Sequence, residues 1–314
     1  MIILEFEQEV FALDARIEEL QRMTERGLDL AREVVKIRKK REMMLKNIYS
    51  RLTPWQKVQV ARHPDRPQGK DFLQHLVQDF TPLAGDRFFG EDAALVGGVG
   101  RFSSIPVMVL VIHRGHDTEE RLAHNFGMAQ PEGYRKAQRL MDLAQKFALP
   151  LLTFVDTSGA YPGIGAEERG QAEAIARCTE KMLALEVPTI AVITGEGGSG
   201  GAVALSVADR IFMLEHAVYS VISPEGCASI LWRSAEKAQE AAEALHLTAQ
   251  DLDKFGVIDG IIAEPLGGAH RDKGAAIEAV KQRLEEALSD LAQQPWEKVL
   301  PEREERFSRL GVDL

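Results

Sequence analysis

A glycine run between two different kinds of segment constrains the fold of this chain most strongly. The run is TGEGGSGGA at 194–202; apolar, largely β-branched residues precede it from 188, and small residues follow it to 208. This order predicts a strand, a glycine-rich turn and a helix. Glycine tolerates positive φ and a close ligand, and the first N–H groups of a helix lack helical partners. Such a turn can bind negative charge, and it is an oxyanion hole if that charge develops only in a transition state.

A second segment of the same kind precedes the first. The apolar run 149–155 predicts a buried strand, and residues 156–165, DTSGAYPGIG, are rich in turn formers. A long helical pattern follows over 166–186. Two neighbouring strands that each end in a glycine loop commonly build a site at the carboxyl edge of a sheet.

Residues 197–201 also satisfy the G-x-S-x-G pattern of serine hydrolases, with Ser199 as the nucleophile. Asp209, Asp259 and His270 lie downstream, so the chain order of a triad is available. Two features favour exposed backbone instead: glycine on both sides of Ser199, and a second glycine loop that a hydrolase does not need. A third interpretation, that Ser199 caps the following helix, ranks above the nucleophile.

Composition limits the classes of function. The chain has 314 residues, is 45% hydrophobic and carries a net charge of −10. This charge argues against nucleic-acid binding and against docking on an anionic membrane. No apolar run reaches the roughly 18 residues of a membrane span, and the N-terminus lacks the basic region of a signal peptide. The two cysteines, Cys178 and Cys227, fit a reducing compartment, so we expect a cytoplasmic protein.

Metal and nucleotide motifs are missing from the sequence. The eight histidines are scattered without zinc-ligand spacing. His113 and His116 stand three residues apart beside Asp117, and a polar loop explains them better than a metal pair. There is no P-loop and no biotinylation-type lysine motif, so we expect no metal, no ATP hydrolysis and no attached biotin in this chain.

The chain divides into three parts by pattern: a helical extension over 1–50, a core over 51–300 and a charged, loosely held tail over 301–314. In the extension, apolar residues recur at helical spacing, and a second helix is expected from about Leu28 to Ile48. The basic run 38–41 within it is better explained as a solvated face than as a polyanion site. We expect a connector over 55–67 and a helix over 72–80.

The core alternates strands with helices, which predicts an α/β fold with parallel pairing. Segments 94–102 and 107–112 should pair through a turn at Ser103 and Ser104, and Pro131 suits the start of a helix to 147. The further elements expected are strands at 188–194, 210–214, 217–222 and 258–262 and helices at 200–208, 225–232, 234–245, 248–255 and 274–291. Periodicity alone does not distinguish this pattern from a doubly wound sheet.

Several motifs, in this order and spacing, resemble the α subunit of bacterial acetyl-CoA carboxylase carboxyltransferase. Ser158 is a departure, because this family usually has proline there. The resemblance covers nearly the whole chain and rests on ARHP at 61, AGDR at 84, NFGM at 125, PEGYRK at 131, DTSGAYPGIGAEERGQAEAIAR at 156, GEGGSGGA at 195, YSVISPEGCASILW at 219 and EPLGGAHRD at 264. It implies a crotonase (ClpP-like) fold of repeated ββα units.

The resemblance also implies chemistry and site residues. In such a subunit a glycine pair is thought to hold an oxyanion, which makes Gly200 and Gly201 the expected catalytic residues through their N–H groups. Gly198 and Ala202 are expected to contact substrate. The pocket wall is expected at Gly159, Ala160, Tyr161, Pro162 and Gly163, although these residues are equally suited to a rigid loop that only positions the next helix.

Finally, the resemblance implies partners. Carboxybiotin would arrive on a separate carrier protein, ATP would be used by a separate biotin carboxylase, and a zinc-ribbon β subunit would complete an α₂β₂ assembly that makes malonyl-CoA from acetyl-CoA. Two further alternatives remain: a self-contained crotonase-like hydratase or isomerase, which would need its own acid–base carboxylate, and a non-catalytic assembly subunit.

Overall fold

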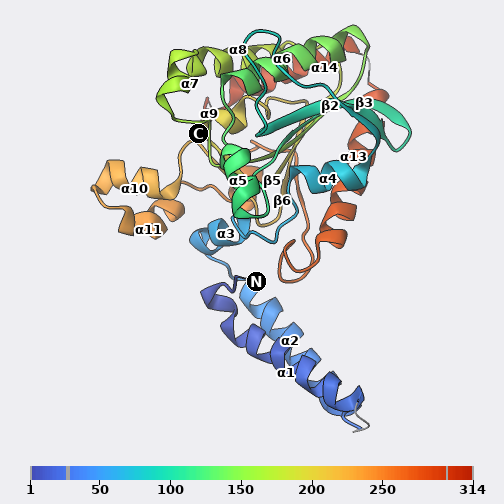
Figure 1. Ribbon diagram of the computed structural model, residues 1–314, viewed down its shortest axis with the longest axis vertical. Coiled ribbons are helices and arrows are strands. Elements are labelled where there is room, and N and C mark those ends of the chain that lie inside the picture. Colours follow the sequence, from blue (N-terminus) through green and yellow to red (C-terminus); the bar gives the residue numbers. More distant parts are fainter. Residues whose placement is uncertain (1, 26–28, 295, 313–314) are drawn as a thin grey trace.

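An α/β core built on one mixed sheet dominates the molecule (Figure 1). The computed structural model describes residues 2–25, 29–294 and 296–312. In this part of the chain the sheet order is β1-β2-β3-β4-β5-β6-β8, with β7 paired to the end of β5. β1, β2 and β3 are antiparallel, and every later pairing is parallel. The strands are β1 (Val77–Pro82), β2 (Leu95–Phe102), β3 (Ile105–Ile112), β4 (Leu151–Thr157), β5 (Thr189–Gly198), β6 (Arg210–Leu214), β7 (Val218–Ser220) and β8 (Gly260–Ile262).

Helices cover the centre of this sheet. Every residue of β4 and β5 is buried, which requires cover on both faces. α6 packs on β2 and β3 and against α8, while α4 packs on β1, β3 and β4 from the other side, where it contacts α13 (Figure 1). The core helices are α4 (Gly69–Leu76), α5 (Thr118–Ala123), α6 (Pro131–Lys146), α7 (Ile164–Glu168), α8 (Gln171–Leu183), α9 (Ser199–Val203), α10 (Pro224–Trp232), α11 (Ala238–Ala244), α12 (Ala249–Lys254) and α13 (Lys273–Ala292).

The predicted β2–β3 hairpin and several predicted helix starts are confirmed. Ser103 and Ser104 both have positive φ between β2 and β3, and Pro131 opens α6. Pro224 follows the Ser223 cap at the start of α10, and Thr248 caps α12. These signals are local, so the sequence is sufficient to predict them.

The N-terminal extension is a helical hairpin that projects from the core (Figure 1). It consists of η1 (Glu5–Glu7), α1 (Gln8–Glu25) and α2 (Ala31–Tyr49). The predicted helices are confirmed, although Leu28, the expected start of the second, lies outside the described residues. The base of the hairpin is fixed to the core, because buried Glu7 accepts hydrogen bonds from Tyr49 and from Arg271 of the core, each at 3.0 Å.

Two predictions between the extension and the sheet are wrong. The expected connector 55–67 contains α3 (Pro54–Ala61), which the Thr53 capping box and Pro54 start. The expected helix 72–80 ends at Leu76, and the chain continues as β1. β1 forms because its backbone can pair with the free edge of β2.

Three boundaries around the glycine loops also differ from prediction. The helix expected over 166–186 is two helices, α7 and α8, because Gly170 adopts φ 79° between them. β5 does not end at 194 but runs through the glycines to Gly198, since β7 extends the pairing on one side. α9 is correspondingly short and ends at Val203 rather than 208.

The tail is not loosely held. Residues 296–309 form α14 (Trp296–Arg309), and Arg303 on this helix is 2% exposed. Its guanidinium pairs with Asp209 at 2.6 Å and donates to the carbonyl of Leu185 at 2.8 Å. The composition of 301–314 is that of a solvated tail, yet buried Arg303, together with the Arg306–Asp259 pair, attaches the segment to the core. Residues 313–314 lie outside the described part.

Candidate functional site

The two predicted glycine loops lie against each other at the carboxyl edge of the sheet. β4 and β5 are parallel neighbours, and Thr157 is paired with Gly197. A side chain at Gly198 would collide with the carbonyl group of Ser158, and one at Gly201 would place its Cβ 2.8 Å from the Ala160 nitrogen. Glycine is therefore required at both positions, because the backbone of the loop 156–165 occupies the space that a side chain would need.

The turn between β5 and α9 is a sharp elbow centred on Ser199. Ser199 has φ 53°, which is uncommon for a residue with a side chain. The N-cap of α9 is Gly198, and no side-chain capping hydrogen bond is present there. The expectation that Ser199 caps the helix is therefore wrong. In the described part of the chain, the N–H groups of Gly200 and Gly201 donate no hydrogen bond to backbone outside α9.

The downstream residues of the hydrolase alternative are not assembled around Ser199. Asp209 binds the backbone N–H of Thr189 at 2.7 Å, so it lies at the amino ends of β5 and β6, on the opposite edge of the sheet. Asp259 pairs with Arg306 at 2.6 Å. His270 stacks on His63, with ring centroids 4.1 Å apart, beside the base of the N-terminal hairpin.

The loop expected to form the pocket wall is held in place by hydrogen bonds. Gly159 has φ 146° and its N–H donates to the Thr157 hydroxyl at 3.0 Å. Tyr161 is fixed through its N–H to the Ala129 carbonyl at 3.0 Å. Gly163 lies against the ring of Tyr161, where a side chain would collide, whereas Pro162 is exposed.

Sequence reasoning missed two buried carboxylates at this edge. β5 bulges opposite Asp156, since Val155 pairs with Ile193 but Thr157 pairs with Gly197. The Asp156 carboxylate fills the bulge and accepts the Glu196 N–H at 2.9 Å. A side chain at Gly195 would place its Cβ 2.6 Å from the same oxygen.

Arginines from distant segments neutralise these carboxylates. Arg114, which follows β3, lies 3.2 Å from Asp156 and 3.4 Å from Glu196. Arg62, from the ARHP motif, pairs with Glu196 and with Glu225 of α10, each at 2.6 Å. The only signals in the sequence were the ARHP motif and Asp156, which begins the loop 156–165. This network ties β4, β5 and α10 to the glycine loops.

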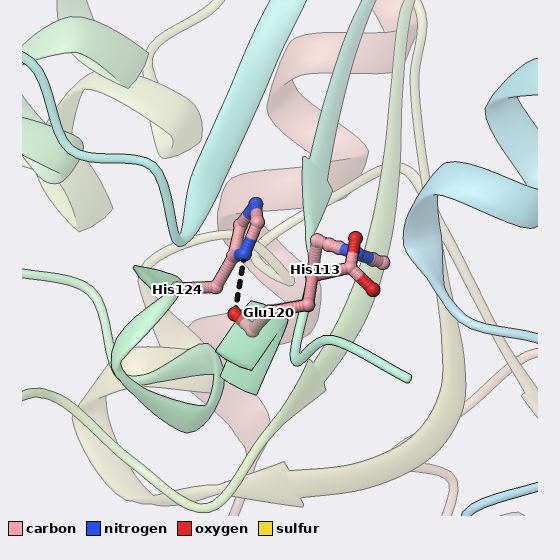
Figure 2. Close-up of side chains that lie close together, drawn as sticks. All are labelled: His113, Glu120 and His124. Atoms are coloured by element: carbon pink, nitrogen blue, oxygen red, sulfur yellow. Dashed lines mark hydrogen bonds and ion pairs between the residues drawn. The ribbon is translucent and has the colours of Figure 1, made fainter. Parts of the chain in front are cut away.

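A histidine cluster near this edge has the composition of a metal site. The side chains of His113, Glu120 and His124 lie close together (Figure 2). However, the ammonium group of Lys70 lies 2.9 Å from His124 Nε2 and 3.6 Å from Glu120, so a metal ion would have to displace it. Burial lowers the pKa of His113 to about 4, and hydrogen bonds from His116 N–H and His113 lower that of Glu120 to about 2. A neutral His113 therefore donates to the Glu120 carboxylate at 2.8 Å.

The overall fold is a crotonase fold, and several solved structures share it. Transcarboxylase 12S with methylmalonyl-coenzyme A bound has a TM-score of 0.61 and 19% identity, over 76% of this chain and 45% of that chain. A Pseudomonas malonate decarboxylase hetero-tetramer in complex with coenzyme A has a TM-score of 0.58 and 20% identity, over 72% and 90%. These likenesses confirm the predicted fold.

Sequence comparison is more specific. The family model described as acetyl co-enzyme A carboxylase carboxyltransferase-like matches residues 3–311, and the chain belongs to this family. The acetyl-coenzyme A carboxylase carboxyl transferase subunits alpha of Rhodospirillum centenum and Acidiphilium cryptum are 56% and 57% identical, over 99% of this chain and 98% of each relative. The resemblance found in the motifs is thus confirmed. None of the described helices has the length and apolar character needed to cross a membrane.

Proposed function

We propose that this chain is the carboxyltransferase α subunit of an acetyl-CoA carboxylase. With a β subunit it transfers CO₂ from carboxybiotin to acetyl-CoA, and the malonyl-CoA formed starts fatty-acid synthesis. Family membership over residues 3–311 supports the reaction. The observation that carries the site is the contact of the two glycine loops, where the backbone of Ala160 occupies the space a side chain at Gly201 would need.

In this proposal the chain's main catalytic contribution is a set of backbone donors. When bound, carboxybiotin supplies the carboxyl group and a urea carbonyl oxygen on which negative charge develops. Gly200 and Gly201 donate their N–H groups to that oxygen, and one such donor is typically worth about 3–4 kcal/mol in the transition state. Gly198 and Ala202 leave room beside it. Residues 159–163 form the wall that orients the reacting groups.

The backbone donors at the start of α9 suit a ligand oxygen that gains negative charge during the reaction. The N–H groups at the start of α9 are neutral donors, so they stabilise a developing charge without binding an anion strongly beforehand. The carboxylates nearest the loops, Asp156 and Glu196, are paired with Arg62 and Arg114. They are therefore placed to hold the backbone, and not to act as the free acid–base group that a hydratase or isomerase would need.

The reaction assigns separate tasks to separate partners. The α-subunit names of the relatives support a β partner for this chain. We infer an α₂β₂ assembly with a zinc-ribbon β subunit, a carrier protein that presents biotin and a biotin carboxylase that uses ATP. A cytoplasmic location fits the two buried free cysteines, Cys178 and Cys227.

The serine hydrolase is the second candidate, and one observation favours it: the positive φ of Ser199 gives the elbow that exposes a nucleophile. The absence of its expected partners from the surroundings of Ser199 argues against it. A fluorophosphonate probe decides between the two, because covalent labelling of Ser199 requires an activated hydroxyl.

The test of the proposed function uses the chain alone and mixed with a zinc-ribbon β subunit from the same genome. The measurement is carboxyl exchange between malonyl-CoA and a soluble biotin derivative. Activity only in the mixture is the expected result. Activity of the chain alone, or none in a complex of the correct mass, overturns the proposal. A complex that stays active after Gly200 and Gly201 are substituted would identify a non-catalytic assembly subunit.

A further inference from the structure

A buried hydroxyl without a partner lies beneath the contact of the glycine loops. Tyr134, on α6, is 0% exposed, and its hydroxyl makes no hydrogen bond to any described residue. It lies 2.9 Å from the position that a Cβ at Gly201 would occupy, and the Ala160 nitrogen lies 2.8 Å from that same position. The Ala160 N–H also donates to no backbone acceptor in the described chain. Two unused donors thus face one side of Gly201.

The hydroxyl has no structural purpose in the isolated chain. A buried polar group without a hydrogen bond lowers stability, and a phenylalanine ring, of the kind that Phe72 and Phe154 bury elsewhere in this core, would avoid this loss. Burial raises the pKa of Tyr134 far above its ordinary value, so the group stays protonated and available as a donor. A group that lowers stability and has no partner in the fold is a candidate for a role with a ligand.

We propose that the Tyr134 hydroxyl donates a hydrogen bond to the ligand oxygen that binds between the two glycine loops. This inference rests on the proposed function and adds a side-chain donor from α6 to the backbone donors of Gly200 and Gly201. The hydroxyl is closed off in the isolated chain, so ligand entry separates 159–160 from 200–201 by a small movement. The bond then satisfies the tyrosine only in the liganded complex.

The experiment compares Tyr134→Phe with Tyr49→Phe in the full α/β complex, by carboxyl exchange and by thermal unfolding. The Tyr49 hydroxyl is also buried, but it is hydrogen-bonded to Glu7 at 3.0 Å, at the base of the N-terminal hairpin. We expect Tyr134→Phe to lower kcat about 10–100-fold with little change in KM, and to leave Tm equal or higher. Tyr49→Phe should instead lower Tm and preserve kcat.

Each outcome has a defined meaning. An inactive wild-type complex overturns the proposed function itself. An active wild type with a Tyr134→Phe variant within twofold of its kcat overturns only the role of Tyr134. A lower Tm accompanying the lower kcat identifies a structural tyrosine and also overturns it. If the phenylalanine variant does not fold, 3-fluorotyrosine at 134 keeps the hydroxyl and makes it a stronger donor; a tenfold or larger loss of kcat there contradicts the proposal.

Discussion

The carboxylate of Asp156 accepts the backbone N–H of Glu196 at 2.9 Å, across a bulge in which β5 has two more residues than β4. The bulge changes the direction of β5 just before Gly197 and Gly198. Because the elbow at Ser199 follows directly, we expect this hydrogen bond to help set the position of the α9 N–H groups. Asp156 is therefore a positioning residue for the glycine loops.

Asp156→Ala tests this dependence. The variant leaves the Glu196 N–H without its acceptor and removes one of the two carboxylates that face Arg114, which should cost about 1–3 kcal/mol of stability. We expect kcat of the α/β complex to fall at least tenfold. The matched control is Asp142→Ala, whose exposed carboxylate pairs only with Lys181. Equal kcat in the two variants would show that the loops keep their position without Asp156.

Gly201→Ala tests the contact between the loops with the smallest possible side chain. The new Cβ would lie 2.8 Å from the Ala160 nitrogen and 2.9 Å from the Tyr134 hydroxyl, so it fills the space between the loops that the ligand oxygen needs. We expect turnover to fall about 10²-fold or more while the complex still assembles. Gly90→Ala is the control, because nothing lies within 4 Å of a Cβ there. Near-normal exchange activity with Gly201→Ala would remove this glycine from the mechanism.

Ser199→Ala separates exposed backbone from a nucleophilic side chain. Alanine keeps the N–H groups of the elbow and removes only a hydroxyl that does not cap α9. We expect most of the exchange activity to remain, measured at saturating malonyl-CoA. Complete loss in a complex with unchanged circular dichroism would instead favour the hydrolase.

Arg303→Ala tests the attachment of α14. The substitution leaves the carboxylate of Asp209, which is 5% exposed, without its partner. Breaking a buried pair in this way typically costs about 3–5 kcal/mol, measured by urea unfolding. Arg309→Ala, at an exposed position of the same helix, should change stability by less than about 0.5 kcal/mol. Similar midpoints for both variants would mean that the other contacts of the helix, such as the Arg306–Asp259 pair, are sufficient to hold it.

Features that depend on residues close together in the sequence could be predicted, and features that depend on distant residues could not. The parallel strands, the caps at Ser223 and Thr248 and the neighbouring glycine loops could be predicted, because their signals are local and because parallel neighbours end at one edge. The Asp156 bulge could not, since it depends on Arg62, Arg114 and Glu196, which meet only after folding. The tail was misjudged for the same reason: Arg303 and Asp209 are 94 residues apart.

His113 should make stability depend on pH. Burial lowers its pKa from 6.5 to about 4, while an unfolded chain regains the ordinary value. Between these limits the unfolded state binds more protons, so stability is complete above pH 6.5 and falls as the pH drops toward 4. The full effect is on the order of 3 kcal/mol. His113→Gln removes this titration and should make the urea midpoint depend less steeply on pH between 7 and 4.5, although buried His63 and His216, whose pKa values burial also lowers, keep part of the slope. His246→Gln, at an exposed position, should keep the wild-type slope, and equal slopes in all three proteins would exclude His113 as the cause.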